Sequence, residues 1–445
     1  MLRAADNNLL TRSDAGTGMG ELFRRFWLPA LLSQELPKPD GPPMRLRIMG
    51  EHLLAFRDSE GRVGLIEPQC AHRGANLFWG RNEQGGIRCA FHGWKYDVGG
   101  HCLEMPTVAK DKAYEKQRAE LKLKSYPIRE AGGFIWTYMG PPKLMPEMPR
   151  FEFMTLPSAH TFVSKKLQQC NWAQACEGAL DTAHFSFLHM SVGDDEDEQA
   201  MMKIMHQSEA AASGDKSRVR WMKKDGVPRF TVTEHDAGLL MGAARTADGD
   251  DLYWRISQFM LPNHALAPSA FPGENYHGQT FVPITDELCW IYCYTWNPER
   301  PLANSERERF SKGHTVHAAV DKNWVPIRNR DNDYLIDRED QKYRTYTGIA
   351  GVSEQDACIQ DSQGFIADRT REHLGPTDIG IVRFRRAILD AAKNLAKGKE
   401  PKAVKKPESY MLRAGGTVAH ASKPLADVMV ARFGDPIGRV HAQAH

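Results

Sequence analysis

Two short segments, each joining a cysteine to a histidine, constrain this chain more than any other feature of its sequence. The first is Cys70-Ala-His72 and the second is Cys89-Ala-Phe-His92. Zinc sites favour Cys-x(2–4)-Cys and His-x(3–5)-His pairs. One cysteine and one histidine from each of two loops instead place two thiolates on one iron and two imidazoles on the other. The segments therefore predict a [2Fe–2S] cluster held by all four residues, with zinc as the alternative.

The sequence around the two segments indicates a small unit built of β-strands. Between residues 44 and 140, short alternating or apolar runs are separated by turn residues, a pattern typical of strands. The expected strands are residues 45–49, 52–56, 63–66 and 134–138. Ahead of them, residues 19–32 are expected to form a helix. The glycine cluster 16–20 follows no strand, so a turn is expected there and not a phosphate-binding loop.

A proline-rich stretch marks the expected boundary between two domains. Its prolines cannot continue a strand, and they are Pro141, Pro142, Pro146 and Pro149. We therefore expect an N-terminal helical segment at 1–40, a cluster-binding domain at 41–145 and a second domain at 146–445. The second domain mixes helical and strand-like patterns, so the fold class expected for the chain is α+β.

Within the second domain, helices are expected at 172–188 and 378–397, and strands at 253–261 and 288–296. Thr377 is suited to cap the last helix at its N-terminus, and Gly398 is suited to end it. The lysine-rich segment 397–406 is expected to be a solvated loop, with a docking patch as the alternative.

A second group of metal-binding side chains lies just after the boundary. Residues 171–189 contain two amides, two carboxylates and two imidazoles. Glu177, Asp181 and His184 are spaced four and three residues apart, which puts them on one face of a helix. His189 shares a metal with His184 only if that helix bends or ends between them. Two imidazoles and a carboxylate leave three adjacent positions open on Fe(II) for O2 and substrate; a polar helix face or a packed histidine are the alternatives.

Charge and cysteine usage narrow the class of protein. The formal net charge is +2, with both signs mixed along the chain, so no field favours nucleic acid or an anionic membrane. The N-terminus lacks the apolar core of a signal peptide, and the longest apolar run, residues 288–296, is too short to span a bilayer. The eight cysteines are therefore expected to be metal ligands or buried thiols of a cytoplasmic protein whose partners are small molecules or proteins.

Both motifs together, in this order, resemble those of the Rieske non-haem iron oxygenases over nearly the whole chain. The resemblance implies a helix-grip antiparallel sheet for the second domain, a Rieske [2Fe–2S] cluster and a separate mononuclear Fe(II). It further implies that His184 and His189 are iron ligands and that a downstream aspartate completes the set. The family places this aspartate in a Gln-Asp pair followed by a polar strand. Gln355-Asp356 matches the pair, and Asp361 is the alternative.

The resemblance also implies a ring-shaped trimer in which electrons cross between subunits. Asp181 then occupies the bridging position. Its carboxylate would accept N–H groups from His184 of its own chain and from His92 of the partner subunit, which orders both imidazoles. A surface aspartate on a helix is the alternative.

Four shorter stretches resemble the phthalate 4,5-dioxygenase branch of this family: residues 332–338, 346–349, 368–370 and 372–375. In that branch a flavin and iron–sulfur reductase passes electrons from NAD(P)H to a single oxygenase chain. The resemblance thus implies hydroxylation of an aromatic carboxylate, with phthalate-like or chlorobenzoate-like substrates. An O-demethylase or ether-cleaving monooxygenase is the alternative within the family, and a Rieske electron carrier without O2 chemistry is the alternative outside it.

An anionic substrate calls for a buried cation beside the iron. Arg245 is the expected candidate, because a guanidinium holds a carboxylate through two hydrogen bonds. The acidic run 194–198, just past His189, is expected to form an exposed loop over the entrance.

Overall fold

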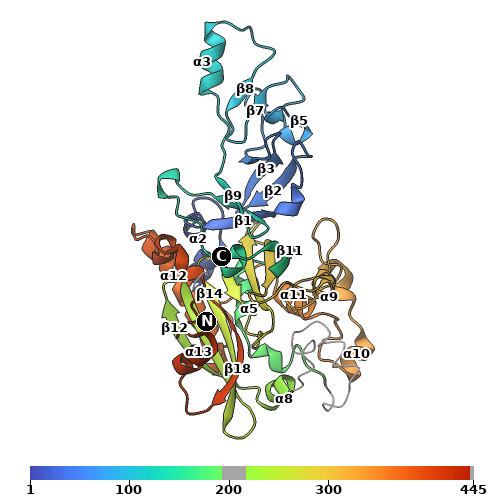
Figure 1. Cartoon of the computed structure of the whole chain (residues 1–445), viewed down its shortest axis with the longest axis vertical. Coiled ribbons are helices and arrows are strands. Elements are labelled where there is room, and N and C mark those ends of the chain that lie inside the picture. The colour runs from blue at the N-terminus through green and yellow to red at the C-terminus, as the bar shows by residue number, and fades with distance from the viewer. Residues whose placement is uncertain (193–216, 441–445) are drawn as a thin grey trace. The chain divides into compact units, whose positions relative to one another are not determined.

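The computed structural model describes residues 1–192 and 217–440, which fold as two compact units (Figure 1). The smaller unit is Phe23–Met145, and the larger unit combines Met1–Leu22 with Pro146–His445. The larger unit is thus discontinuous in sequence, and the expected N-terminal segment 1–40 is divided between the two units. The acidic run 194–198 lies outside the described residues.

The smaller unit consists mainly of antiparallel strands in three sheets. The first sheet has the order β1 (Trp27–Leu32), β10 (Phe134–Tyr138), β9 (Ile128–Ala131); the second has β2 (Met44–Ile48), β3 (Glu51–Arg57), β4 (Val63–Ile66); and the third has β5 (Arg81–Glu83), β6 (Gly86–Arg88), β7 (Lys95–Tyr96), β8 (Cys102–Glu104). One helix that the sequence pattern did not predict, α3 (Lys112–Glu120), begins at Asp111, whose carboxylate accepts two backbone N–H groups.

The helix predicted at residues 19–32 is present only in the first part of that range. Helix α2 (Gly18–Phe23) is followed by strand β1, every residue of which is buried against β10. A continuous apolar run is compatible with a buried strand as well as with a buried helix. Pro29 decides between them, because in a helix interior it would remove a backbone hydrogen bond.

The larger unit is built on an antiparallel sheet of eight strands within the described residues. Its order is β11 (Thr161–Gln168), β17 (Cys289–Trp296), β16 (Tyr276–Pro283), β15 (His264–Leu266), β14 (Asp251–Met260), β13 (Gly238–Thr246), β12 (Arg229–His235), with β18 (Gly415–His420) paired to β14. Strands β14 and β17 correspond to the two strands expected from the sequence. The α+β fold, with an N-terminal β unit and a C-terminal antiparallel sheet with helices, is confirmed.

Helices cover this sheet. Helix α5 (Trp172–Leu180) packs on β14, β15 and β16, and both α11 (Val352–Ser362) and α12 (Ile379–Leu395) pack against α5. Helix α12 matches the last expected helix, although Asp378 and not Thr377 is its N-cap residue. The described residues also form helices α1 (Ala4–Thr11), α4 (Glu152–Thr155), α8 (Ser217–Lys224), α9 (Asn304–Ser311), α10 (Arg338–Tyr343) and α13 (Leu425–Phe433). Among the described helices, none has the length and apolar character needed to cross a membrane.

Candidate active site

The two Cys–His segments of the smaller unit form equivalent loops. In the first, Cys70 donates its backbone N–H to Ala75 and accepts one from Gly74; in the second, Cys89 does the same with Trp94 and Gly93. Both turns need a left-handed backbone, with φ of +73° at Gly74 and +74° at Gly93, which glycine adopts without strain. The sequence therefore shapes two matching loops that each present one sulfur and one imidazole.

The side chains of these loops fit an iron–sulfur cluster. The rings of His72 and His92 lie 4.4 Å apart between centroids, and His72 stacks on Trp94. The Nδ1 atoms of both histidines are buried and have no hydrogen-bond partner among the described residues. An unpartnered buried nitrogen costs free energy. One iron of a [2Fe–2S] cluster would satisfy both nitrogens, and the buried sulfurs of Cys70 and Cys89 would bind the other iron.

In the larger unit, helix α5 ends earlier than expected, and this brings two histidines together. The helix stops at Leu180, because Asp181 leaves the helical conformation and its Oδ1 accepts the N–H of Ala183 at 2.7 Å. The expectation that Glu177, Asp181 and His184 share one helix face is therefore wrong. His184 instead lies in a short 3-10 turn, His184–Ser186, from which its ring faces that of His189.

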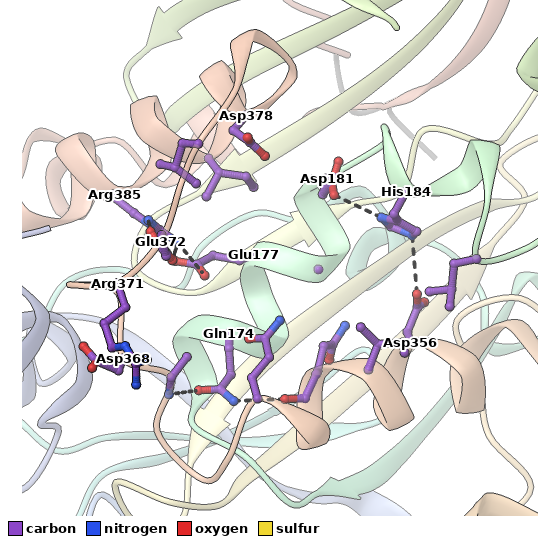
Figure 2. A pocket seen from close by; sticks show the side chains of 18 residues that line it. Gln174, Glu177, Asp181, His184, Asp356, Asp368, Arg371, Glu372, Asp378 and Arg385 are labelled. Carbon is purple, nitrogen blue, oxygen red and sulfur yellow. Dashed lines mark hydrogen bonds and ion pairs between the residues drawn. The ribbon is translucent and has the colours of Figure 1, made fainter. Parts of the chain in front are cut away.

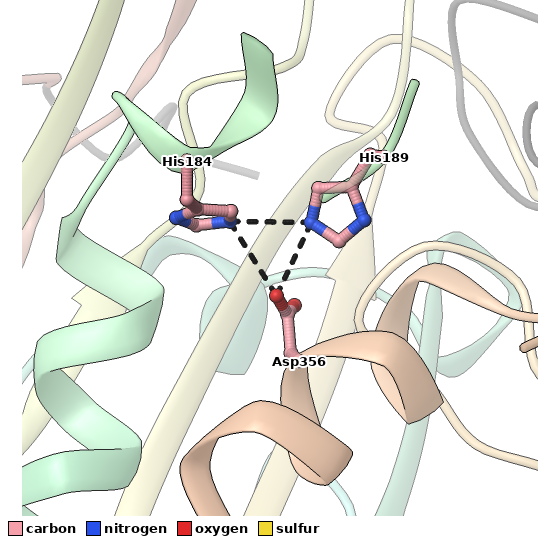
Figure 3. A group of neighbouring side chains, drawn as sticks. All are labelled: His184, His189 and Asp356. Carbon is pink, nitrogen blue, oxygen red and sulfur yellow. Dashed lines mark hydrogen bonds and ion pairs between the residues drawn. The ribbon is translucent and has the colours of Figure 1, made fainter. Parts of the chain in front are cut away.

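Three side chains converge on one point (Figure 3). The Nε2 atoms of His184 and His189 are 3.2 Å apart, and Oδ1 of Asp356 lies 3.4 Å from the first and 3.2 Å from the second. Bonds of about 2.1 Å that meet a metal at about 100° separate their ligand atoms by about 3.2 Å. The arrangement thus has the dimensions of a metal site with two histidines and one carboxylate.

Asp361, the alternative third ligand, lies elsewhere. Its carboxylate accepts hydrogen bonds from Gln168 and from the hydroxyl of Tyr334, and it is not part of the cluster of metal-binding atoms. The polar strand expected after the Gln-Asp pair is instead helix α11. Asp356 is on the face of that helix that meets the two histidines.

Hydrogen bonds fix which nitrogen of each ring points to the common centre. Nδ1 of His189 donates to Oε1 of Gln355 at 2.6 Å, and the amide orientation of Gln355 is set because its Nε2 donates to Ile349. Nδ1 of His184 lies 3.4 Å from Oδ2 of Asp181. When the rings are neutral, both Nε2 atoms therefore carry lone pairs. Lone pairs that face one another repel, so a cation between them is favoured. The orienting role of Gln355 was not predicted.

A large polar cavity of about 610 Å³ opens beside His184 and Asp356 (Figure 2). Asp181, His184 and Asp356 line it, together with acidic and basic residues of the segment before α12. At its base, Glu177 forms ion pairs with Arg369 at 3.0 Å and with Arg385 at 2.7 Å. Asp181 links this cavity to the metal-binding atoms. Its side chain lines the cavity and is 28% exposed, and its Oδ2 atom lies 3.4 Å from Nδ1 of His184.

A second cavity, of about 100 Å³, shares Asp356 with the first. Phe185 and helix α5 residues Gly178 and Ala179 close it from one side. Sheet residues line the other side, among them Lys166, Arg255 and Gln279. The metal-binding atoms therefore lie between an open polar cavity and a narrow one.

Comparison with known proteins decides the family. The protein-family model of the Rieske [2Fe-2S] domain matches residues 26–127. The family model described as "LigXa C-terminal domain like" matches residues 137–414. The chain belongs to the Rieske non-haem iron oxygenases. It is an oxygenase subunit that carries a Rieske [2Fe–2S] cluster and a mononuclear iron.

Relatives of this oxygenase match along most of its length. The oxygenase subunit of 3-chlorobenzoate-3,4-dioxygenase from Comamonas testosteroni is 35% identical, over 94% of this chain and 95% of that protein. The oxygenase subunit of phthalate 4,5-dioxygenase from Pseudomonas putida is 36% identical, over 88% of this chain and 86% of that protein. The fold is similar to that in a crystal structure of dicamba monooxygenase bound to 3,6-dichlorosalicylic acid, with a TM-score of 0.55 at 18% identity. The match covers 84% of this chain and 99% of that chain, and it supports the fold.

Two buried arginines bear on the expected carboxylate anchor of this oxygenase. Arg245 is fully buried (0% exposed) and lines neither cavity. Arg255, on the adjacent strand β14, is 3% exposed and lines the narrow cavity. The pairing of Ala243 with Arg255 puts both arginines on one face of the sheet. Only Arg255 reaches the cavity, and this register could not be read from the sequence.

Proposed function

We propose that this Rieske oxygenase uses O2 and electrons from a separate flavin and iron–sulfur reductase, ultimately from NAD(P)H, to hydroxylate an aromatic carboxylate in the cytoplasm. The observation that carries the proposal is the buried guanidinium of Arg255 in the wall of the cavity that reaches Asp356. The two relatives named above, which act on chlorobenzoate and phthalate, support the same substrate class.

We assign the cluster to Cys70, His72, Cys89 and His92, and the mononuclear iron to His184, His189 and Asp356. When bound, the cluster supplies single electrons and the iron activates O2. The protein contributes orientation. Gln355 and Asp181 hold the two imidazoles with Nε2 toward the iron, and side chains that orient metal ligands in this way sustain both affinity and activity.

Neighbouring side chains fix the position of the Arg255 guanidinium. Its Nε donates to Oγ1 of Thr182 at 2.7 Å, and its guanidinium lies 3.9 Å from the ring centroid of Phe185. Its Nη2 is buried and has no hydrogen-bond partner among the described residues. A substrate carboxylate would satisfy this donor and pair a buried charge, which places the aromatic ring beside Asp356.

The large polar cavity is proposed to receive the cluster-bearing unit of a second copy in a trimer. Asp181 lines this cavity and also neighbours His184. Its carboxylate would accept the N–H of His92 of the partner subunit, so that one residue links the cluster of one chain to the iron of the next.

Isotope labelling tests the proposed function. The iron-loaded enzyme is incubated with reductase, NADH and 18O2 on a panel of phthalates, chlorobenzoates and methoxybenzoates. We expect a cis-dihydrodiol that contains two labelled oxygens. Formaldehyde release, or a phenol with one label, would instead establish a demethylating or ether-cleaving monooxygenase. Iron-loaded, reducible enzyme that oxidises no aromatic acid would refute the proposal.

Replacing Arg255 by Leu is expected to weaken binding of an aromatic acid about thirtyfold or more. Loss of one partner of a buried, hydrogen-bonded charge pair costs about 2–5 kcal/mol, and each 1.4 kcal/mol is about a factor of ten. A methyl ester of the acid should lose much less. Equilibrium binding to iron-loaded protein measures the effect, and Arg245→Leu is the matched control, expected to change affinity for the acid less than about threefold. Equal losses in both variants would contradict the assignment of Arg255.

The affinity for Fe(II) is expected to rise with pH. Burial lowers the pKa of His184, but the carboxylates of Asp181 and Asp356 outweigh it and raise this pKa to about 9. Below pH 9 the iron-free ring therefore holds a proton that iron must displace, so apparent affinity should increase about tenfold per pH unit and level off above the pKa. Anaerobic Fe(II) titrations between pH 7 and 9.5 measure this. Asp181→Asn should move the plateau to lower pH; an affinity independent of pH between 7 and 8.5 would contradict the prediction.

A further inference from the structure

A second buried cation lies in the narrow cavity. Lys166, on β11, is 4% exposed and lines the cavity together with Arg255 and Asp356. Its ammonium donates a hydrogen bond to the hydroxyl of Ser353 on α11. Among the described residues, no carboxylate lies within 4 Å of this ammonium, whereas buried lysines elsewhere in proteins are almost always paired.

The strand register places Lys166 on the face of the sheet that lines the cavity. Lys166 pairs with Ile291, which pairs with Phe281 of β16, so all three side chains share one face. Gln279 and, through β15, Arg255 belong to the same face, because alternate residues of a strand point the same way. This is the face on which helix α5 closes the cavity.

Lys166 and Arg255 belong to strands that are not neighbours in the sheet. Four strand intervals separate β11 from β14 in the sheet, which corresponds to about 19 Å between the two backbones. Both residues nevertheless line one cavity of about 100 Å³, so each contributes a buried cationic side chain to its wall. The carboxylate of Asp356 also lines this cavity, but it is assigned to the iron. Buried cations are costly unless anions neutralise them, so an anionic ligand is favoured here.

We propose that Lys166 is a second substrate-binding cation, so that the cavity selects an aromatic ring with two acidic groups, one held by Arg255 and the other by Lys166. This inference rests on the proposed function. A monocarboxylate would satisfy Arg255 alone and leave the ammonium of Lys166 with Ser353. The second acidic group therefore adds a charge-assisted hydrogen bond in a buried place, where such bonds are strongest.

Binding of matched ligands tests the role of Lys166. Isothermal titration of the iron-loaded oxygenase uses benzoate and the three benzenedicarboxylate isomers. At least one dicarboxylate should bind wild-type protein about tenfold or more tightly than benzoate, because a charge-assisted hydrogen bond contributes about 1.5–3 kcal/mol. Lys166→Met should remove this preference and change the affinity for benzoate less than about threefold. Partial unfolding would reduce binding of both ligands alike, so the ratio of the two affinities reports on the side chain.

Lys165→Met is the matched control. Lys165 is also buried on β11, but it points to the opposite face, where its ammonium lies 4.5 Å from the ring centroid of Trp290. This variant should keep the preference for the dicarboxylate. The inference is overturned if no isomer binds more tightly than benzoate, or if Lys166→Met weakens benzoate as much as the dicarboxylate. If monocarboxylates bind and depend on Arg255 while Lys166→Met changes nothing, only this inference fails; if no aromatic acid binds at all, the proposed function fails.

Discussion

Changing His184 to Ala is expected to abolish turnover and to lower the iron content of fully loaded protein from about three atoms per chain to about two. The variant loses one of the two imidazoles that converge with Asp356, whereas the cluster loops, in a separate compact unit, keep all their ligands. The absorption and electron paramagnetic resonance spectra of the cluster should therefore be unchanged. Metal analysis together with these spectra measures the result.

Two aspartate variants sharpen this test. Asp356→Asn should also lose the third iron, because it alters a side chain 3.2 Å from Nε2 of His189. Asp361→Asn should retain it, because Asp361 hydrogen bonds Gln168 and Tyr334 instead. Wild-type protein with two irons at full loading, or a His184→Ala variant with three, would rule out the mononuclear site as placed here.

Changing Asp181 to Asn is expected to slow oxidation of the reduced cluster by about 10- to 100-fold, while both metals should stay bound. The carboxylate of Asp181 takes one backbone N–H and neighbours His184, and its exposed part faces the large cavity. An amide cannot accept from two imidazoles with the same charge. Rapid mixing of reduced enzyme with O2 and substrate follows the reaction through cluster absorbance.

Asp378→Asn is the control for this variant, because Asp378 lines the same cavity without touching His184 (Figure 2). It should oxidise its cluster at the wild-type rate. An Asp181→Asn enzyme that behaves like this control would remove Asp181 from the path of electrons and leave it as a cap for helix α5.

The cluster loops could be predicted because everything that shapes them is local. Each loop places its cysteine, histidine and glycine within a few residues, and the turn geometry follows from the left-handed glycine. The mononuclear site is different. Asp356 comes from helix α11, far along the chain from His184, and no periodicity connects the two. Its selection depended on the family resemblance, and the structure brings it to the two histidines.

Other parts of the site were beyond sequence patterns for distinct physical reasons. The end of α5 depends on a side chain that competes for a backbone N–H at Asp181. The choice between Arg245 and Arg255 depends on which of two arginines on one sheet face reaches a cavity. Lys166 was not predicted to be a site residue, because a lysine within a strand pattern is usually solvent-exposed. Only the register of five strands shows that it faces inward.

The discontinuity of the larger unit has a consequence for the order in which the enzyme matures on the ribosome. All four cluster residues lie within Phe23–Met145, a stretch that emerges early, and domains fold as units as they emerge. Helix α1 can pack only after residues near the other end of the chain have been synthesised. Asp6 forms an ion pair with Lys393, and Asn7 accepts a hydrogen bond from Arg369. The iron-binding residues close only after α11 has been synthesised. The residues that would hold the cluster are thus all synthesised before those that would complete the mononuclear iron site, so the part of the enzyme that activates O2 is the last to be assembled.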